Sequence, residues 1–126
     1  MLQPADTFYP ENADIWVETM PNAEIAQHTV HNLFCRLPYA SQKAYEWIAS
    51  EDEMSQQCGY LTLARLFMQG LRPDERSAYE FLDQARTALH DPLPVRRAAV
   101  SALQKYQTLD EAAREAGEKV LREIGA

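Results

Sequence analysis

The stretch EMSQQCGYLTLARLFMQG, residues 53–70, limits the fold of this chain more than any other segment. Read as a helix, it is apolar on two sides rather than one. One side carries Met54, Cys58, Leu61 and Met68, and the other carries Tyr60, Leu63, Phe67 and Leu71. Because each apolar side must be covered, we predict that this helix is sandwiched between two layers of the protein.

Helical periodicity continues before and after this stretch. Apolar residues recur at steps of three to five, and no segment alternates strictly between apolar and polar residues as a half-buried strand would. The predicted helices cover residues 22–37, 39–50, 53–70, 74–90, 95–106 and 109–124, and a short one is expected around residues 13–20. The chain is therefore predicted to be all-α, with six to seven helices.

Polar residues mark several of the predicted helix ends. Ser50 with Glu53, and Thr108 with Glu111, have the spacing of a capping box, in which each side chain satisfies a free backbone N–H of the other residue. Gly70 is expected to end the central helix, because glycine accepts the left-handed conformation that often follows a last turn.

The predicted helices fall into pairs. The pairs over residues 39–70 and 74–106 each span roughly the 30 to 35 residues of one helical-hairpin repeat. With a central helix that needs cover on two sides, this favours a HEAT/ARM-like α-α superhelix of stacked hairpins over a closed bundle. Residues 1–13, which contain two prolines and no helical period, are expected to form an irregular arm, and residues 14–126 a single HEAT-like repeat domain.

Charge and composition restrict the partners. The chain of 126 residues has 19 acidic and 12 basic residues, for a net charge of −7. This charge repels a nucleic-acid backbone unless the basic side chains gather on one face, so a protein partner is expected before DNA. The two cysteines, the lack of an N-terminal targeting pattern and the lack of any apolar run near the ~20 residues of a membrane helix predict a cytoplasmic protein without a membrane partner.

Two segments carry a resemblance to a known family. DPLPVRRAAVSALQKY, residues 91–106, resembles the second helix of a HEAT-like repeat, with an aspartate before the helix and small residues at packing positions. Together with YEWIASEDEMSQQCGYLTLARL, residues 45–66, it is similar to the C-terminal half of the AlkD-type DNA alkylation repair proteins. The resemblance covers about residues 14–125 and implies a HEAT-like superhelix related to enzymes that excise alkylated purines. In it, Asp91 can accept hydrogen bonds from free amides at the start of its helix.

The first family positions fall in the helix over residues 22–37. The resemblance places the family's first tryptophan at Ala23 and its catalytic aspartate at Gln27, with His31 at a polar position further along. An alanine and an amide cannot supply the carboxylate that would stabilise an oxocarbenium-like sugar.

The remaining family positions lie in the later helices. A second tryptophan corresponds to Met54, and the paired arginines that would grip phosphate correspond to Gln56 and Gln57. A third tryptophan corresponds to Ser101, and a following arginine to Gln104. The resemblance thus predicts that no catalytic residue remains at Ala23, Gln27, Met54 or Ser101.

A metal site is a further hypothesis. His28, His31 and Cys35 share one helix face by their spacing, and with Cys58 they could surround zinc. A structural zinc site usually takes close ligand pairs from two segments, and the second pair is missing here. Neither a metal nor a cofactor is therefore predicted.

Basic and amide side chains are the candidate binding residues. The basic group dense enough to attract an anion comprises Arg65, Arg72, Arg76, Arg96 and Arg97. An alternative is that Arg96 forms a structural ion pair with Asp91. The candidate binding residues are Gln56, Gln57, Arg65, Arg96, Arg97 and His31.

These patterns lead to alternative functions. The first is a small noncatalytic HEAT-like module, related to the alkylpurine glycosylases, that binds another macromolecule on its concave surface. The alternative is a DNA glycosylase acting on alkylated purines in base excision repair, with His31 or Glu24 replacing the missing acid. The residue replacements favour a pseudoenzyme over an enzyme. A third hypothesis is association with a partner through the N-terminal helix layer.

Overall fold

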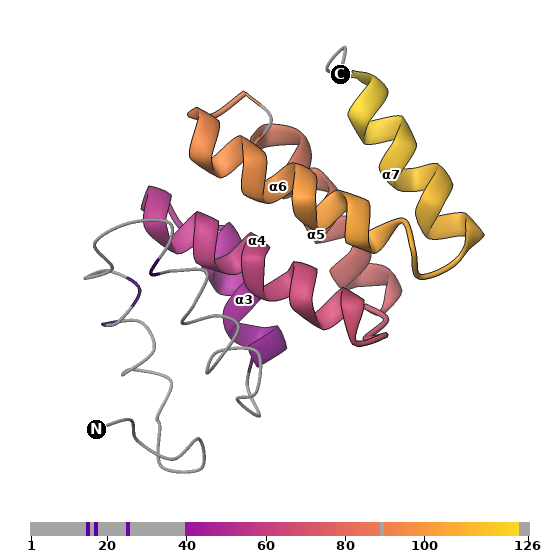
Figure 1. Ribbon diagram of the computed structural model, residues 1–126, viewed down its shortest axis with the longest axis horizontal. Helices are drawn as coiled ribbons and strands as arrows, with labels where there is room; N and C mark the ends of the chain where they lie inside the picture. Colours follow the sequence, from indigo (N-terminus) through magenta and orange to yellow (C-terminus); the bar gives the residue numbers. More distant parts are fainter. Residues whose placement is uncertain (1–14, 16, 18–24, 26–39, 89, 124–126) are drawn as a thin grey trace.

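The structure, a computed structural model, describes residues 15, 17, 25, 40–88 and 90–123. Within these residues it is all-helical and contains no strand (Figure 1). The helices are α3 (Ala40–Ile48), α4 (Glu53–Met68), α5 (Glu75–Ala88), α6 (Leu93–Tyr106) and α7 (Glu111–Glu123). The predicted arm and the predicted helices before residue 39 lie outside the continuous described part, so the predicted total of six to seven helices is not tested.

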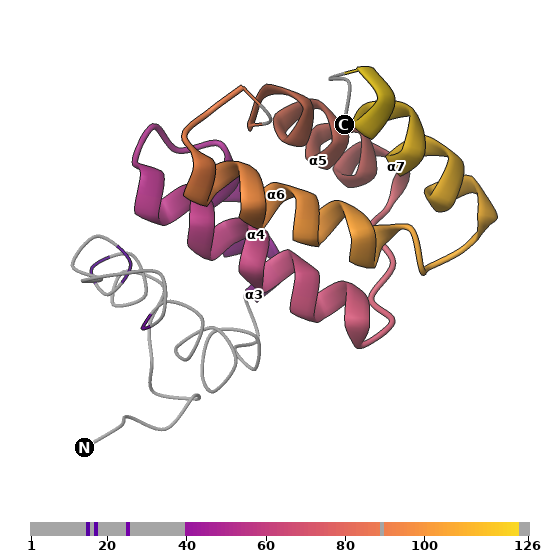
Figure 2. The ribbon, with the colours of Figure 1, turned by 45° about the horizontal axis from the view of Figure 1, so that its top comes forward.

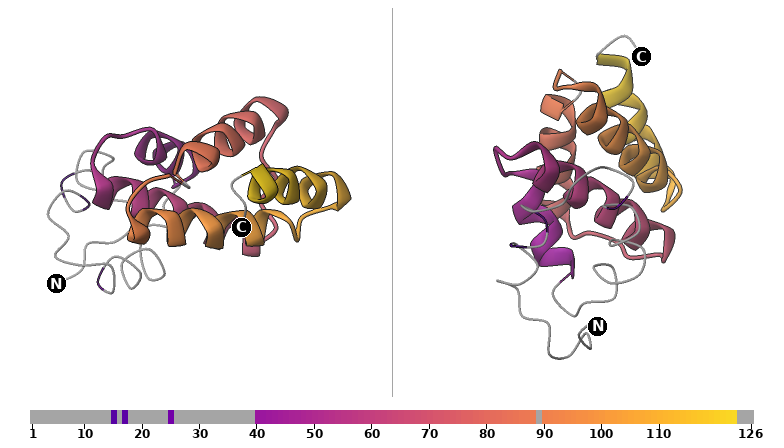
Figure 3. Two further views of the ribbon diagram at one scale, coloured as in Figure 1. Left: turned by 90° about the horizontal axis from the view of Figure 1, so that it is seen from above. Right: turned by 60° about the vertical axis from the view of Figure 1, so that its left-hand side comes forward.

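Four of the five described helices form two layers. Helices α4 and α6 lie side by side and run in the same direction in one layer, and α3 and α5 form the other (Figures 2 and 3). Helix α3 packs against α4 and α5 against α6, so the chain builds two stacked helical hairpins. Helix α7 packs against α5 and α6 at the C-terminal end of the stack. Within the described residues, no helix is both long and apolar enough to cross a membrane.

Helix α4 contacts both α3 and α6, which confirms the predicted sandwich. Of its two predicted apolar sides, one is buried at Tyr60, Leu63 and Phe67, whereas its fourth predicted member, Leu71, lies beyond the end of the helix and is 40% exposed. The other is only partly covered: Cys58 is buried, but Met68 is 53% exposed. Helix α4 therefore keeps a narrow open stripe.

Four aromatic rings join three helices in the core. Phe81 of α5 lies with its ring centre 5.2 Å from that of Phe67 on α4 and 5.3 Å from that of Tyr106 on α6. Phe67 and Tyr106 are 5.5 Å apart, and Tyr60 approaches Phe81 edge-on at 6.5 Å. Such tilted and edge-to-face pairs add to the stabilisation from burial of the rings. This cluster fixes α5 across the α4–α6 layer.

Aspartates, rather than the predicted capping boxes, begin two of the helices. Asp52 accepts a hydrogen bond from the Ser55 backbone N–H at 2.9 Å at the start of α4, and Asp110 accepts one from Ala113 at 2.7 Å at the start of α7. Ser50 instead accepts from the Asp52 N–H, and Thr108 donates to the Lys105 carbonyl. The predicted boxes at Ser50 and Thr108 are therefore wrong, because an aspartate closer to each helix provides the acceptor.

The start of α6 and the end of α4 bear on two further predictions. Pro92 precedes α6 and no side chain caps its first turn, so Asp91 does not cap this helix as expected. Gly70 follows α4 with a φ of +87°, and the Leu71 N–H donates to the Leu66 carbonyl at 3.0 Å. The predicted glycine stop is confirmed, because this left-handed conformation favours a residue without Cβ.

Gly59 is the point of closest approach between α3 and α4. A Cβ atom there would lie 2.7 Å from Ile48 Cγ2, 2.8 Å from the Ile48 backbone N and 2.9 Å from the Ala44 carbonyl oxygen. Two of these atoms belong to the α3 backbone, so the helices would have to separate. Glycine in this helix interior is therefore required by packing.

We predict that Gly59→Ala destabilises the protein by about 1–3 kcal/mol, because the cost of overpacking exceeds the gain of up to about 1 kcal/mol in helix propensity. Gly117→Ala in α7 is the matched control, since a Cβ atom there meets only the side chain of Gln107. Urea denaturation measures the free energy of unfolding of both variants. Equal stability of the two variants would show that the α3–α4 contact is looser than described.

An ion pair fastens the loop after α4 to the start of α7. Arg72 Nη1 donates to Asp110 Oδ2 at 2.9 Å, and Nη2 donates to the Leu109 carbonyl, also at 2.9 Å. The other carboxylate oxygen of Asp110 caps α7. One aspartate thus serves as both the helix cap and the partner of a residue 38 positions away.

Asp110→Ala is expected to lower the free energy of unfolding by about 1 kcal/mol, because it removes the cap and the ion pair together. Arg72→Ala is expected to cost less, since exposed ion pairs contribute about 0–1 kcal/mol. Thermal or urea unfolding measures the loss of stability in each variant and shows which loss is larger. A larger effect of Arg72→Ala would contradict the role given to the cap.

Candidate functional site

The predicted site residues that the structure describes lie on the two helices of one layer. Met54, Gln56 and Gln57 are in the first turn and a half of α4, and Arg65 is in its last turn. The other predicted residues, Arg96, Arg97 and Ser101, belong to α6. Ala23, Gln27 and His31 lie outside the described residues, as does Glu24. The structure therefore tests the later part of the predicted site and leaves its first helix a prediction.

The two adjacent amides are both engaged in the body of the protein. Gln56 is half-buried, and its Nε2 donates to the Ser50 carbonyl at 2.6 Å, which ties the first turn of α4 to the preceding loop. Gln57 is only 6% exposed. Because neither amide lies open to solvent, we assign Gln56 a positioning role in the loop between α3 and α4 rather than direct contact with a ligand.

An open surface, here called the α4–α6 face, runs along the outer side of this layer. Its members share helical spacings of three, four or seven residues and are exposed or half-buried. They are Met54, Leu61, Arg65 and Met68 on α4 and Leu93, Arg97, Ser101 and Gln104 on α6. Helices α4 and α6 run in the same direction, so their first turns lie at one end of the face (Figure 2). Arg65 and Gln104 belong to the last turns of these helices and therefore lie towards the other end.

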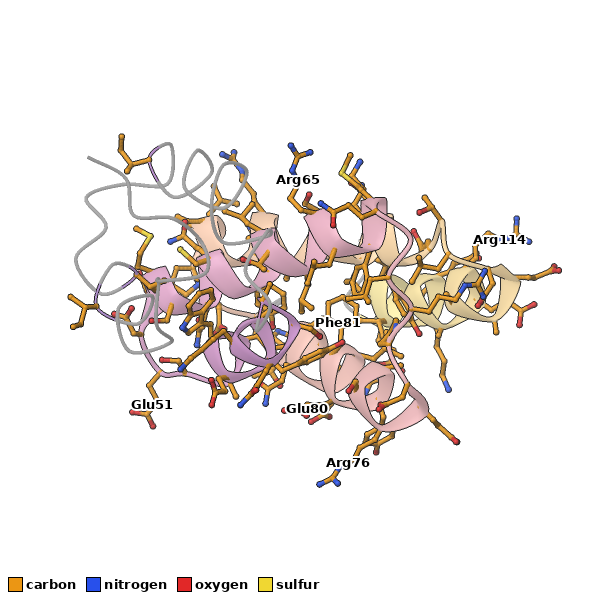
Figure 4. All side chains as sticks on the ribbon, turned by 90° about the horizontal axis from the view of Figure 1, so that it is seen from below. Glu51, Arg65, Arg76, Glu80, Phe81 and Arg114 are labelled. Atoms are coloured by element: carbon orange, nitrogen blue, oxygen red, sulfur yellow. The ribbon has the colours of Figure 1, made fainter. Side chains whose placement is uncertain are left out.

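Figure 4 shows the direction of this face. Arg65 projects from α4 on the side of the molecule opposite Arg76 and Glu80 of α5, and Phe81 lies between the layers. Arg65 Nη1 lies 3.7 Å from Met68 Sδ, so a guanidinium and a thioether adjoin on the face. Leu93, 43% exposed, supplies a further apolar side chain on α6.

The charge of this layer differs from that of the rest of the chain. Helices α4 and α6 contain four basic residues, Arg65, Arg96, Arg97 and Lys105, and one acidic residue, Glu53. The remainder of the chain contains eight basic and eighteen acidic residues. No member of the α4–α6 face is acidic. A positive surface therefore lies on a protein of net charge −7.

Basic residues elsewhere are largely neutralised by acidic neighbours. The ion pairs are Lys43–Glu46, Arg72–Asp110, Arg86–Glu123, Arg114–Glu111 and Arg122–Glu118. Within the described part of the chain, Arg96 forms no ion pair with Asp91, so the predicted structural pair is wrong. The basic group predicted from the sequence is also divided, because Arg72 is held by Asp110 and Arg76 projects from the opposite side (Figure 4).

The position of Arg96 and Arg97 is unfavourable for the helix itself. Both are exposed near the start of α6, whose first turn contains no acidic residue. The helix dipole makes this end positive, so Arg96 in the first turn is placed unfavourably, and Arg97 follows one residue beyond that turn. Stability of α6 therefore does not account for two adjacent arginines at this point.

Apart from the α4–α6 face, a shallow hollow lies beside the first turn of α5. It is lined by Asp74, Glu75, Arg76 and Tyr79, and Tyr79 is 77% exposed. Asp74 accepts from the Ser77 N–H at 2.7 Å, and this bond holds the pKa of its carboxyl below the usual value. The Asp74 carboxylate thus caps the start of α5. The hollow is lined by both acidic and basic side chains.

The zinc hypothesis receives no support from the described residues, which contain no group of three His, Cys, Asp or Glu side chains placed to hold a metal. His28, His31 and Cys35 lie outside them. Cys58 is fully buried, and burial, with the Asp52 carboxylate, raises the pKa of its thiol from 9.0 to about 12. Cys58 is therefore a protonated core residue.

Comparison of the chain with protein-family models, with curated proteins and with solved structures gave no match. The resemblance to the AlkD-type family therefore stays a prediction from the quoted segments.

We predict that Cys58 resists alkylation in the folded protein. In a Cys35→Ser variant, which leaves Cys58 as the sole cysteine, iodoacetamide should react at least about tenfold more slowly at pH 8 in the folded protein than in urea, where the thiol regains its ordinary pKa. Because the folded pKa is raised, reactivity should stay low as pH rises from 7 to 9. Equal rates with and without urea would contradict the burial of this thiol.

Proposed function

We propose that this protein is a small, noncatalytic HEAT-like module that binds another macromolecule, and that the partner is a protein rather than DNA. The two stacked hairpins, α3–α4 and α5–α6, support the repeat assignment, since HEAT-like repeats stack in this way and present one layer of helices to a partner. A cytoplasmic location is part of the same proposal.

The observation that carries the proposal is the composition of the α4–α6 face. Its members include two methionines, two leucines and two arginines, without lysine or an acidic residue. Methionine and arginine are enriched at protein–protein interfaces, whereas lysine, glutamate and aspartate are depleted there. Exposed Met68 and Leu93 would lose contact with water when a partner packs on them.

Charge supports a protein partner over DNA. Tight non-specific binding to a duplex requires several phosphate contacts from clustered cations. The α4–α6 face has two arginines, with Arg96 and Lys105 at its margins, and the protein as a whole is acidic. Of the basic residues elsewhere, five are held by carboxylates.

The outer surface of α7, at the C-terminal end of the stack, is suited to contact with water rather than with another helix. Helix α7 buries Ala113, Gly117 and Val120, and its outer side is charged. This is the arrangement of a terminal capping helix in a repeat protein. Any partner that extends the stack would therefore bind at the N-terminal layer, a hypothesis that concerns the part of the chain before residue 40.

The competing function is excision of alkylated purines. It requires an acid near the damaged nucleotide, and the residues proposed for that role, His31 and Glu24, lie outside the described part of the chain. The later family positions are occupied here by Met54, Gln56, Gln57 and Ser101, of which Gln57 is buried and Gln56 is hydrogen bonded to Ser50. This supports the noncatalytic alternative.

A glycosylase assay separates the two functions. With a duplex containing N-methylated purines, we expect no base release above the uncatalysed rate, and duplex binding no tighter than about 10⁻⁵ M at physiological salt, within the range of non-specific binding. A commercial alkylpurine glycosylase serves as the positive control. Release of modified base, or tight binding that weakens steeply with salt, would reverse the proposal.

A further inference from the structure

We infer that the outer side of α5 is a second protein-binding surface, which takes an arginine-containing, basic segment of a partner protein. This surface belongs to the layer opposite the α4–α6 face, so the inference goes beyond the proposed function and does not depend on it. It is carried by exposed carboxylates and an exposed tyrosine ring that lie together on one side of a helix.

The surface, here called the α5 outer face, lies opposite the buried side of the helix. Phe81, Ala85 and Ala88 are the buried residues of α5. At 3.6 residues per turn, the members of the face occupy the positions on the other side. They are exposed, and they are Glu75, Arg76, Tyr79, Glu80 and Asp83, with Asp74 immediately before the helix. The face therefore presents four carboxylates and one guanidinium to solvent.

Three of these carboxylates have no cationic partner within the described part of the chain. Glu75, Glu80 and Asp83 form no ion pair there, whereas five other acidic residues are paired with cations. Arg76 is the only cation among the members of the face, and Arg86, further along α5, is held by a carboxylate of α7. The face therefore keeps an excess of negative charge.

The stability of α5 does not account for these side chains. Glu75 lies in the first turn, where a carboxylate interacts favourably with the helix dipole. Glu80 and Asp83, however, lie in the middle of the helix, one turn apart, where like charges repel and aspartate has a low helix propensity. Tyr79 is 77% exposed and so contributes little to the core. These groups are better explained by contact with a partner.

The negative charge extends towards α3. Tyr45 of α3 is half-buried, and burial, together with the Asp74 and Glu80 carboxylates, raises the pKa of its hydroxyl from 10.0 to about 12. Glu51, in the loop after α3, projects from the same side of the molecule as Glu80 (Figure 4). A basic segment would therefore be attracted to a broader surface than α5 alone.

The spacing of the aromatic and acidic side chains fits arginine. Glu75, Tyr79 and Asp83 follow one another at steps of four residues, so the ring lies between two carboxylates. A guanidinium stacks on an aromatic ring and binds a carboxylate through paired N–H donors, whereas an ammonium group does not form this planar contact. The two carboxylates are separated by about 12 Å along the helix, the distance between arginines about two helical turns or four extended residues apart.

A defined peptide tests the inference on the full chain. The probe is a fluorescent peptide of about three helical turns, with arginine at every fourth position between alanines. It should bind, and a peptide with glutamate in place of arginine should not. A lysine peptide of equal charge should bind at least about threefold more weakly, because an ammonium group cannot stack and pair at once. Binding of the arginine peptide should weaken as salt rises.

Substitutions on α5 should change the affinity in both directions. Glu80→Gln combined with Asp83→Asn should weaken binding by at least about tenfold, and Tyr79→Ala by at least about threefold. Arg76→Gln should tighten binding by at least about twofold, because it removes the cation of the face. Since loss of folding cannot raise the affinity, this variant separates the effect of charge from structural damage.

Glu115→Gln combined with Glu118→Gln is the matched control. These carboxylates are exposed on α7 with the same spacing of three residues, so the protein loses the same charge at another place. The control should change the affinity by less than about twofold. Thermal unfolding monitors the folding of every variant.

Several results would overturn the inference. Absence of binding of the arginine peptide, or equal weakening by the α5 and α7 double substitutions, would remove the α5 outer face as a binding surface and leave the proposed function intact. Equal binding of the arginine and lysine peptides, unaffected by Tyr79→Ala, would show only general attraction of cations to an acidic protein. Release of modified base in the glycosylase assay would overturn the proposed function and leave this inference intact.

Discussion

Burial of α4 on two sides sets the positions of the helices around it. One side of this helix approaches α3 so closely at Gly59 that a methyl group would meet the α3 backbone. A second side of α4 places Tyr60 and Phe67 against Phe81 of α5. Phe67 also contacts Tyr106 of α6. Since both contacts must be satisfied at once, the rotation of α4 about its axis is fixed, and with it the direction in which its remaining side chains point.

The α4–α6 face follows from this rotation. Met54, Leu61, Arg65 and Met68 occupy the part of α4 left between its buried sides, and the parallel arrangement of α6 places Arg97 and Leu93 on the same outer surface. Elsewhere in the described part of the chain, five cations are paired with carboxylates, as in Arg72–Asp110 between the loop after α4 and α7. The face is thus the place where exposed apolar side chains and basic side chains lie together.

The sequence predicts the helical class, the sandwiched position of α4 and the glycine stop at Gly70, because these depend on periodicity and on single residues with a strong conformational preference. The sequence-based prediction of helix caps fails where two nearby side chains can each accept a hydrogen bond from the first turn. Asp52 and Asp110 begin helices that Ser50 and Thr108 were expected to cap, since a carboxylate nearer the first turn forms the better charge-assisted bond. The structural use of Gln56 depends on loop geometry that residue spacing does not encode. The absence of acidic residues from the face could have been found by counting charges helix by helix.

A ¹⁵N nuclear magnetic resonance titration of the full chain, with a peptide that carries glutamates on one side of a helix and leucines on the other, locates the binding surface directly. We expect chemical-shift changes to concentrate on residues of α4 and α6 at the outer face, including Arg65, Met68 and Arg97, while α5 and the outer side of α7 stay unchanged. Changes concentrated on α5 or α7, or no changes at saturating peptide, would contradict the claim that the open side of the α4–α6 layer is a binding surface of this protein.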